Sequence, residues 1–197
     1  MTVLLAFART LGAFNAAALA LGRWLGAACI GAMVIIIIVQ VIFRYGLGNA
    51  LPWTEEAARF LMLWMAGLMA PTAFRRGGFV SVDLVVSMLP RAVACFISLL
   101  LLVLTAVVLW KGLLIGWSEV TGFGGRFTMA AIKVPVSFDL SQWMAIPRSW
   151  MLASLAIGVT AMFSVCLELI LRTLITLLGG RERLPAIALA HTTLGAE

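Results

Sequence analysis

The stretch WLGAACIGAMVIIIIVQVIF, Trp24–Phe43, decides what kind of protein this is, because none of its residues is charged. A helix that crosses the ~30 Å hydrocarbon core of a bilayer needs about 20 mostly apolar residues, each rising 1.5 Å. In lipid the backbone must satisfy its own hydrogen bonds, and the stretch lacks the alternating pattern of a barrel strand. It therefore predicts a membrane-spanning helix.

Three further uncharged stretches are each bounded by charged residues: Phe60–Phe74, Ala92–Trp110 and Ser149–Leu167. The shortest reaches spanning length once Ala57 and Ala58 are included and Arg59 extends its aliphatic stem towards water. Hydrophobic residues make up 63% of the chain and the mean hydropathy is +1.13. A soluble domain is only ~45–50% apolar. The sequence therefore predicts an all-α membrane protein with four transmembrane helices.

The connection between the first two spans has the residues of a tight turn, Gly46–Asn49. Thr54 is the predicted N-cap of the second span, because its hydroxyl can accept a hydrogen bond from the first turn. Glu55 and Glu56 follow at the positive end of the helix dipole. The run Arg75–Gly78 combines last-turn arginines with glycines, which predicts the end of this helix.

The connection between spans two and three, Phe79–Leu89, is apolar but too short to span. Asp83 and Ser87 are four residues apart, so they share one face of a helix while valines cover much of the remainder. This pattern predicts a short amphipathic helix that lies in the membrane interface and is stopped by Pro90.

The chain divides into one membrane domain and two ends. Residues 1–22 are predicted as an N-terminal amphipathic or flexible segment, which is either an interfacial helix or a frayed tail. Residues 23–175 form the predicted four-span domain, and residues 176–197 a polar C-terminal tail. Between spans three and four, Ser118–Ile146 is the longest polar stretch and contains a glycine-rich turn at Gly122–Gly125.

The distribution of basic residues favours both termini in the cytoplasm of a bacterium, with the protein in the inner membrane. Cytoplasmic connections carry an excess of Lys and Arg. With the N-terminus inside, the cytoplasmic side holds Arg9, Arg23, Arg75, Arg76, Arg91, Arg172, Arg181 and Arg183. The outer side then holds the smaller set Arg44, Arg59, Lys111, Arg126, Lys133 and Arg148.

The sequence offers little catalytic chemistry. The single histidine, His191, lies in the tail, so histidine ligation of haem between spans is not expected. The carboxylates lie at span ends or in connections, and Glu168, at the edge of span four, is predicted to pair with Arg172. The net charge of +6 comes without a basic stripe with interleaved aromatics, so nucleic-acid binding is not expected. We predict no enzyme activity, metal or cofactor, and a protein that works as a subunit.

Two features could form a contact with a partner subunit. Trp64 lies in the middle of span two, where its indole N–H needs an acceptor, either in another subunit or within this chain. Small residues also recur at four-residue spacing, which permits close approach of helices. These pairs are Gly22/Gly26, Ala27/Gly31 and Ala66/Ala70.

The order of motifs resembles the small permease subunit of tripartite ATP-independent periplasmic (TRAP) transporters. The residues that carry the resemblance are Arg44-Tyr45, Trp53-Thr54-Glu55-Glu56, Arg59-Phe60, Trp64, Arg75-Arg76-Gly77-Gly78, Val82-Asp83, Leu89-Pro90 and Pro147. The resemblance covers roughly residues 24–172 and is sharpest over 44–90.

The resemblance implies partners and a role. The partners are a large multi-span permease subunit, which holds the substrate and ion sites, and a periplasmic substrate-binding protein that delivers an organic acid. The role is that of a scaffold that braces the stationary part of an ion-coupled transporter, without ATP. The Ser118–Ile146 segment departs from the family pattern and is a candidate contact for the binding protein through Arg126 and Lys133.

Local roles follow for the candidate residues. Arg44 and Arg59 are expected to pair with Glu55 and Glu56 at the first turn. Arg75 and Arg76 are expected to set topology and bind lipid headgroups, and Asp83 to orient the interfacial helix. The candidate interface or anchoring residues are therefore Arg44, Trp53, Glu55, Glu56, Arg59, Trp64, Arg75, Arg76 and Asp83. A haem-free membrane anchor of a respiratory or redox complex and a membrane-bound enzyme are the competing interpretations.

Overall fold

A computed structural model of the chain describes residues 2–49, 51–76, 91–135 and 143–178. It contains four helices that are long and apolar enough to cross a membrane, as predicted: α1 (Thr2–Val41), α2 (Pro52–Arg75), α4 (Arg91–Thr121) and α5 (Ser149–Leu177). The interfacial helix expected at Phe79–Leu89, with Asp83, lies outside the described residues, as does the tail from residue 179 onwards.

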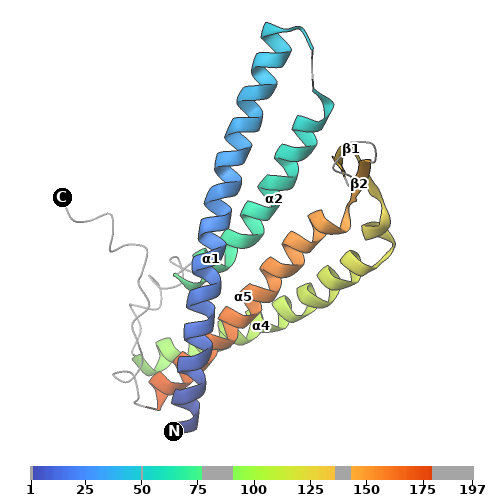
Figure 1. Ribbon diagram of the computed structural model, residues 1–197. Helices are drawn as coiled ribbons and strands as arrows, with labels where there is room; N and C mark the ends of the chain where they lie inside the picture. Colours follow the sequence, from blue (N-terminus) through green and yellow to red (C-terminus); the bar gives the residue numbers. More distant parts are fainter. Residues whose placement is uncertain (1, 50, 77–90, 136–142, 179–197) are drawn as a thin grey trace, which may run out of the picture.

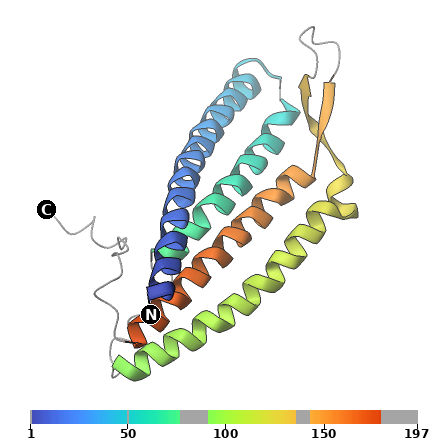
Figure 2. The ribbon, with the colours of Figure 1, turned by 60° about the horizontal axis from the view of Figure 1, so that its bottom comes forward.

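The helices stand side by side in the order α1, α2, α5, α4, so they form a single layer and not a closed bundle (Figures 1 and 2). In the most apolar 18-residue stretch of α5, 33% of the residues are buried within the chain, whereas in the corresponding stretches of α1 and α4 only 6% are buried. The outer helices therefore leave most of their apolar surface for lipid or another subunit.

Packing in the layer centres on α5. One buried hydrophobic cluster takes a residue from every helix: Leu19 of α1, Phe74 of α2, Leu109 of α4, and Val165 and Cys166 of α5. These buried side chains pack closely against one another, and close packing is the main attraction between helices in lipid. The cluster therefore holds the four helices in one unit.

Helix α1 continues without a break through residue 22, so the N-terminal segment is helical and not a frayed tail. At 40 residues it extends over ~60 Å, about twice the hydrocarbon thickness. Its buried positions recur after alternating steps of three and four residues: Leu5, Ala8, Gly12, Asn15, Leu19, Gly22 and Gly26. This stripe packs α1 against α5 and α2. The division of the chain at residues 22 and 175 stays a prediction.

The turn between α1 and α2 forms where the glycines predicted it. A π-helical turn, Ile42–Gly46, ends α1, Gly48 has a φ of 64°, and the Asn49 N–H donates to the Phe43 carbonyl at 3.0 Å. The prediction that Thr54 is the N-cap of α2 is wrong. Leu51 takes that position because Pro52 suits the first helical residue, and the Thr54 hydroxyl donates to the Leu51 carbonyl at 2.8 Å.

Helices α2 and α5 approach each other closely at Gly67 and Gly158. A Cβ on Gly158 would lie 2.6 Å from the Gly67 carbonyl oxygen, and a Cβ on Gly67 would collide with the Ser154 carbonyl oxygen. Pro71, inside α2, lacks the N–H that would otherwise bond this Gly67 carbonyl. The freed carbonyl therefore faces the Gly158 backbone, where a Cα–H···O contact can form.

The polar stretch after span three folds into an element that the sequence did not predict. After α4, a 3-10 turn at Phe123–Arg126 leads into an antiparallel pair of strands, β1 (Thr128–Pro135) and β2 (Trp143–Pro147). The Arg148 N–H closes this unit by donating to the Phe127 carbonyl at 2.7 Å. The hairpin lies at the same end of the layer as the turn between α1 and α2 (Figures 1 and 2).

Candidate functional site

The described residues contain one buried ion cluster, and Glu168 of α5 is its centre. The Glu168 side chain is fully buried. Arg75 of α2 donates to it through Nη2 at 2.7 Å and Nε at 3.1 Å. Arg172 donates through Nε at 2.9 Å, and Asn15 of α1 through Nδ2 at 2.9 Å. The carboxylate therefore accepts four hydrogen bonds from three helices.

Helix α1 completes the cluster with its backbone and with Asn15. The Arg75 Nη2 also donates to the Gly12 carbonyl at 2.9 Å. The Ser164 hydroxyl donates to Asn15 Oδ1 at 2.8 Å, which fixes the amide orientation. Gly12 leaves room for the carboxylate, because a Cβ there would lie 3.0 Å from Glu168 Oε1. The cluster thus ties the ends of α2 and α5 to the N-terminal half of α1.

The cluster has the properties of a group that stabilises the packing of the helices. A buried carboxylate is tolerated only when it is paired and hydrogen-bonded, and every bond named here is supplied by the chain itself. The side chains of Arg75 and Arg172 are only 14% and 13% exposed. Among the described residues, no group of three or more His, Cys, Asp or Glu side chains could hold a metal ion.

The sequence predicted one contact of this cluster and missed the others. The pair between Glu168 and Arg172 is confirmed. Arg75 was assigned to lipid headgroups, but its guanidinium binds Glu168 inside the chain. Asn15 was not singled out, although it is the only amide on the buried stripe of α1. A polar residue at a buried packing position is the signal that would have found it.

The other candidate residues surround the first turn and the end of α2. Arg59 pairs with Glu55, and both side chains are about two-thirds exposed. In the π-helical turn that ends α1, the Arg44 guanidinium lies 5.9 Å from the centre of the Tyr45 ring. Trp53, 40% exposed, lies in the first turn of α2, and the half-buried Glu56 follows directly after that turn. At the other end, the backbone N–H of the half-buried Arg76 donates to the Thr72 carbonyl. Their interface and anchoring roles stay predictions.

Trp64 packs its ring beside Phe60, with 6.2 Å between the ring centroids. Its indole nitrogen is buried and has no acceptor among the residues that the structure describes. Because this nitrogen is covered by the chain itself, a partner could reach it only if the surrounding side chains rearranged. The role of Trp64 at a subunit contact stays a prediction.

We expect Trp64→Phe to leave the thermal stability of the isolated chain unchanged or to raise it. The substitution keeps an aromatic ring and removes a buried donor, whose lack of a partner costs about 1–3 kcal/mol. The measurement is the fraction of detergent-solubilised chain that stays monodisperse after heating. A clear loss of stability in the isolated chain would mean that the indole N–H has an acceptor within the fold.

The small-residue pairs have different surroundings. A Cβ on Gly22 would lie 3.2 Å from the Leu68 carbonyl, and one on Gly26 would lie 2.9 Å from Met69 Cε, so this pair packs α1 against α2. A Cβ on Gly31 would have nothing within 4 Å. Ala66 and Ala70 are exposed on α2, in line with Met62 and Ala73. We call these four residues the α2 outer face.

Comparison with known proteins gives a family match over most of the spanning region. Residues 33–176 match the family model described as tripartite ATP-independent periplasmic transporters, DctQ component. A Haemophilus influenzae protein named as a TRAP transporter small permease protein is 32% identical over 83 residues, which are 41% of this chain and 52% of the relative.

A second relative is much longer than the matched region. It is the isethionate TRAP transporter permease protein DctMQ of Oleidesulfovibrio alaskensis, 32% identical over 93 residues. The match covers 42% of this chain but only 14% of that protein. The alignments thus span about half of the first relative and about a seventh of the second. The match to the family model begins at residue 33, so the N-terminal half of α1 lies outside it.

Proposed function

Because the chain belongs to the DctQ component family of TRAP transporters, we propose that it braces a large multi-span permease subunit in the membrane. The chain is a multi-pass membrane protein whose helices form a layer with two broad faces, a shape suited to lying against a larger protein (Figure 2). The long relative supports such a partner, because the matched region is only a small part of a protein named as a permease.

The observation that carries this proposal is the exposed α2 outer face. Helix α2 has neighbours on both sides, yet Ala66 and Ala70 remain exposed. Small side chains allow a partner helix to approach the backbone closely, and close packing drives helix association in lipid. A helix of the large permease that lies along Met62, Ala66, Ala70 and Ala73 would therefore gain contacts with α2 and its neighbours.

In the proposed complex, the large permease carries the substrate and ion sites, and a periplasmic protein delivers an organic acid. This proposal rests on the family and on its resemblance at the motifs around Trp53–Trp64 and Arg75–Gly78. The hairpin of β1 and β2 and the turn between α1 and α2 would face the periplasm, with both termini in the cytoplasm. A C-terminal reporter that is active only in the periplasm would contradict this orientation.

We expect Ala70→Trp to reduce the amount of large permease that co-purifies with this chain from gently solubilised native membranes. An indole at the centre of the α2 outer face would hold a partner helix away. The matched control is Val108→Trp, which adds the same ring at a position 69% exposed on α4. The measurement is mass spectrometry of the affinity-purified complex, with the two subunits quantified.

Three results would count against the proposal. Recovery of the wild-type chain alone, or with an oxidoreductase, would contradict a scaffold for a permease. Equal recovery of the permease with Ala70→Trp and wild type would show that the partner contacts another face. Loss of permease with both tryptophan variants would likewise remove α2 as the specific contact.

A further inference from the structure

The residues in the buried stripe of α1 recur every seven positions. They form two sets, one at Leu5, Gly12, Leu19 and Gly26 and the other at Ala8, Asn15 and Gly22. Apart from Asn15, the members of the stripe are small or apolar, and they pack against α5 and α2. A slide of α1 along its own axis by one repeat, about 10.5 Å at 1.5 Å per residue, therefore places similar residues against the same neighbours. Packing of the small and apolar members alone distinguishes these heights only weakly.

Neither the length of α1 nor its connection to α2 fixes its height by itself. Helix α1 has 40 residues and extends over ~60 Å, twice the ~30 Å hydrocarbon thickness, so it still crosses the membrane after such a slide. The five residues 47–51 that join it to α2 can reach over ~17 Å when extended. A local feature of the stripe is therefore needed to hold α1 at one height.

Asn15 is a member of the stripe whose contacts fit one height. It is only 3% exposed, and its amide binds α5 at three points. Nδ2 donates to Glu168 Oε2 at 2.9 Å and to the Ser164 carbonyl at 3.3 Å, and Oδ1 accepts from the Ser164 hydroxyl at 2.8 Å. A slide of one repeat brings Ala8 or Gly22 to this level, and neither residue has a side chain that can replace the amide.

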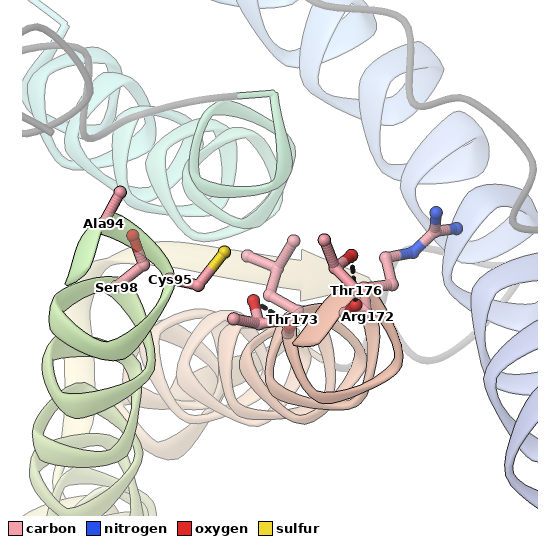
Figure 3. A pocket seen from close by; sticks show the side chains of 7 residues that line it. Ala94, Cys95, Ser98, Arg172, Thr173 and Thr176 are labelled. Atoms are coloured by element: carbon pink, nitrogen blue, oxygen red, sulfur yellow. Dashed lines mark hydrogen bonds between the residues drawn. The ribbon is translucent and has the colours of Figure 1, made fainter. Parts of the chain in front are cut away.

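Gly12 selects the same height through the space that it leaves. A Cβ on Gly12 would lie 3.0 Å from Glu168 Oε1 and 3.2 Å from Arg172 Nη2. The Arg172 guanidinium, which donates to Glu168, points from α5 towards α1 (Figure 3). A slide of one repeat brings Leu5 or Leu19 to this level, where the longer side chain would overlap the carboxylate and the guanidinium. Helix α1 would then have to move away from α5, or the ion cluster would have to open.

We propose that Gly12 and Asn15 set the register of α1, meaning which of its residues lie level with Glu168 and Ser164 of α5. A polar residue in a packed seam between helices can specify one register even where it adds little stability. The ion pairs of the cluster join α2 to α5, whereas Gly12 and Asn15 decide which part of α1 lies against them. Both residues precede residue 33, where the family match begins, so this inference rests on the fold and not on the proposed function.

The test uses disulfides as reporters of the register, in the full chain and in native membranes. A Cβ on Gly22 would lie 4.0 Å from Leu68 Cβ, a separation that suits a disulfide. Gly22→Cys with Leu68→Cys therefore reports the register described here. Leu68→Cys alone reports a slide of one repeat towards the N-terminus, because this slide brings the native Cys29 to the level of Gly22. Alanine replaces Cys95 and Cys166 in both reporters, and Cys29 in the first. Mass spectrometry after mild oxidation gives the linked fraction.

A relocation variant moves the two residues by one repeat and keeps the composition of the stripe. Its substitutions are Gly12→Leu, Asn15→Gly, Leu19→Gly and Gly22→Asn. We expect α1 to slide by seven residues, about 10.5 Å, towards its N-terminus. The linked fraction of the Leu68→Cys reporter should therefore rise from background to the level that the first reporter reaches in the otherwise unchanged chain. A folded relocation variant whose Leu68→Cys reporter stays at background would overturn the proposal.

A milder pair of variants decides the question if the relocated chain does not fold. Leu19→Ala removes the side chain that blocks the slide, and Asn15→Ala removes the amide. With Leu19→Ala alone, the Leu68→Cys reporter should stay unlinked although packing is lost, because Asn15 still holds the register. Adding Asn15→Ala should link this reporter in part of the chains and lower the linked fraction of the first reporter. A double variant that loses heat stability but keeps the register would show Asn15 to be a stabilising contact only and would refute the proposal, as would linking with Leu19→Ala alone.

Discussion

Replacing Glu168 with alanine is expected to be among the most destabilising single changes in this protein. The substitution removes the carboxylate that binds Arg75, Arg172 and Asn15, and it leaves two largely buried guanidinium groups without this partner. Removing one member of a buried ion pair typically costs about 3–5 kcal/mol. The measurement is the amount of monodisperse chain in detergent and its loss on heating.

The matched control for this prediction is Glu55→Ala. Glu55 and Arg59 have the same four-residue spacing as Glu168 and Arg172, but their side chains are about two-thirds exposed. An exposed pair of this kind contributes only about 0–1 kcal/mol, so the control should change heat stability little. Equal effects of the two substitutions would show that burial does not set the strength of the Glu168 cluster.

A triple variant separates the loss of charge pairing from the loss of side-chain volume. Arg75→Met, Glu168→Leu and Arg172→Met together remove all three charges and keep the space filled. Apolar replacement of a whole buried ion cluster is often neutral or stabilising. We expect this variant to recover most of the stability lost in Glu168→Ala, whereas a further decrease would point to a role for the charges beyond packing.

Gly158→Ala is the second change with a large expected effect, and its sign is opposite to that expected from helix propensity. Alanine in place of glycine favours an isolated helix by about 1 kcal/mol. At Gly158, however, the added Cβ would lie 2.6 Å from the Gly67 carbonyl oxygen and 2.9 Å from the Gly67 Cα. These are backbone atoms, so α2 and α5 must move apart, and overpacking of this kind costs about 1–3 kcal/mol.

The control is Gly31→Ala on α1, where the added Cβ would have nothing within 4 Å. This change should leave the stability of the isolated chain unchanged or raise it, while Gly158→Ala should lower it. Heat stability in detergent, measured on both variants in parallel, gives the comparison. A stabilised Gly158→Ala would mean that the two helices are not held at the close distance described here.

Much of the architecture was predictable because lipid restricts the choices. The four uncharged stretches, each with charged ends, had to become spanning helices, since a backbone in lipid satisfies its hydrogen bonds only in a helix or a closed barrel. The arginines and glycines after Phe74 likewise marked the end of α2 correctly. Its N-cap was placed three residues late, at Thr54 and not at Leu51, because the fit of Pro52 to the first helical position was given too little weight.

The candidate site was only partly predictable. The pair of Glu168 with Arg172 follows from local spacing in one helix, and the sequence found it. The hydrogen bonds of Glu168 to Arg75 and Asn15 join residues on three helices, and no spacing along the chain predicts them. The hairpin of β1 and β2 was missed for a related reason, since the stretch has no strict alternation and its strands form only by pairing with each other.

The sequence by itself determined that this chain spans the membrane with four helices, because charge-free length is a property of each segment alone. Its ordered motifs also indicated the transporter family that the comparison then showed. The tertiary structure decided which polar residues lie in the interior and which small residues face a neighbour. Asn15, Arg75 and Glu168 meet, and Gly67 faces Gly158, only because α1, α2 and α5 cross at particular heights and rotations. Those crossings depend on side-chain packing between segments that are distant in sequence, which residue periodicity does not encode.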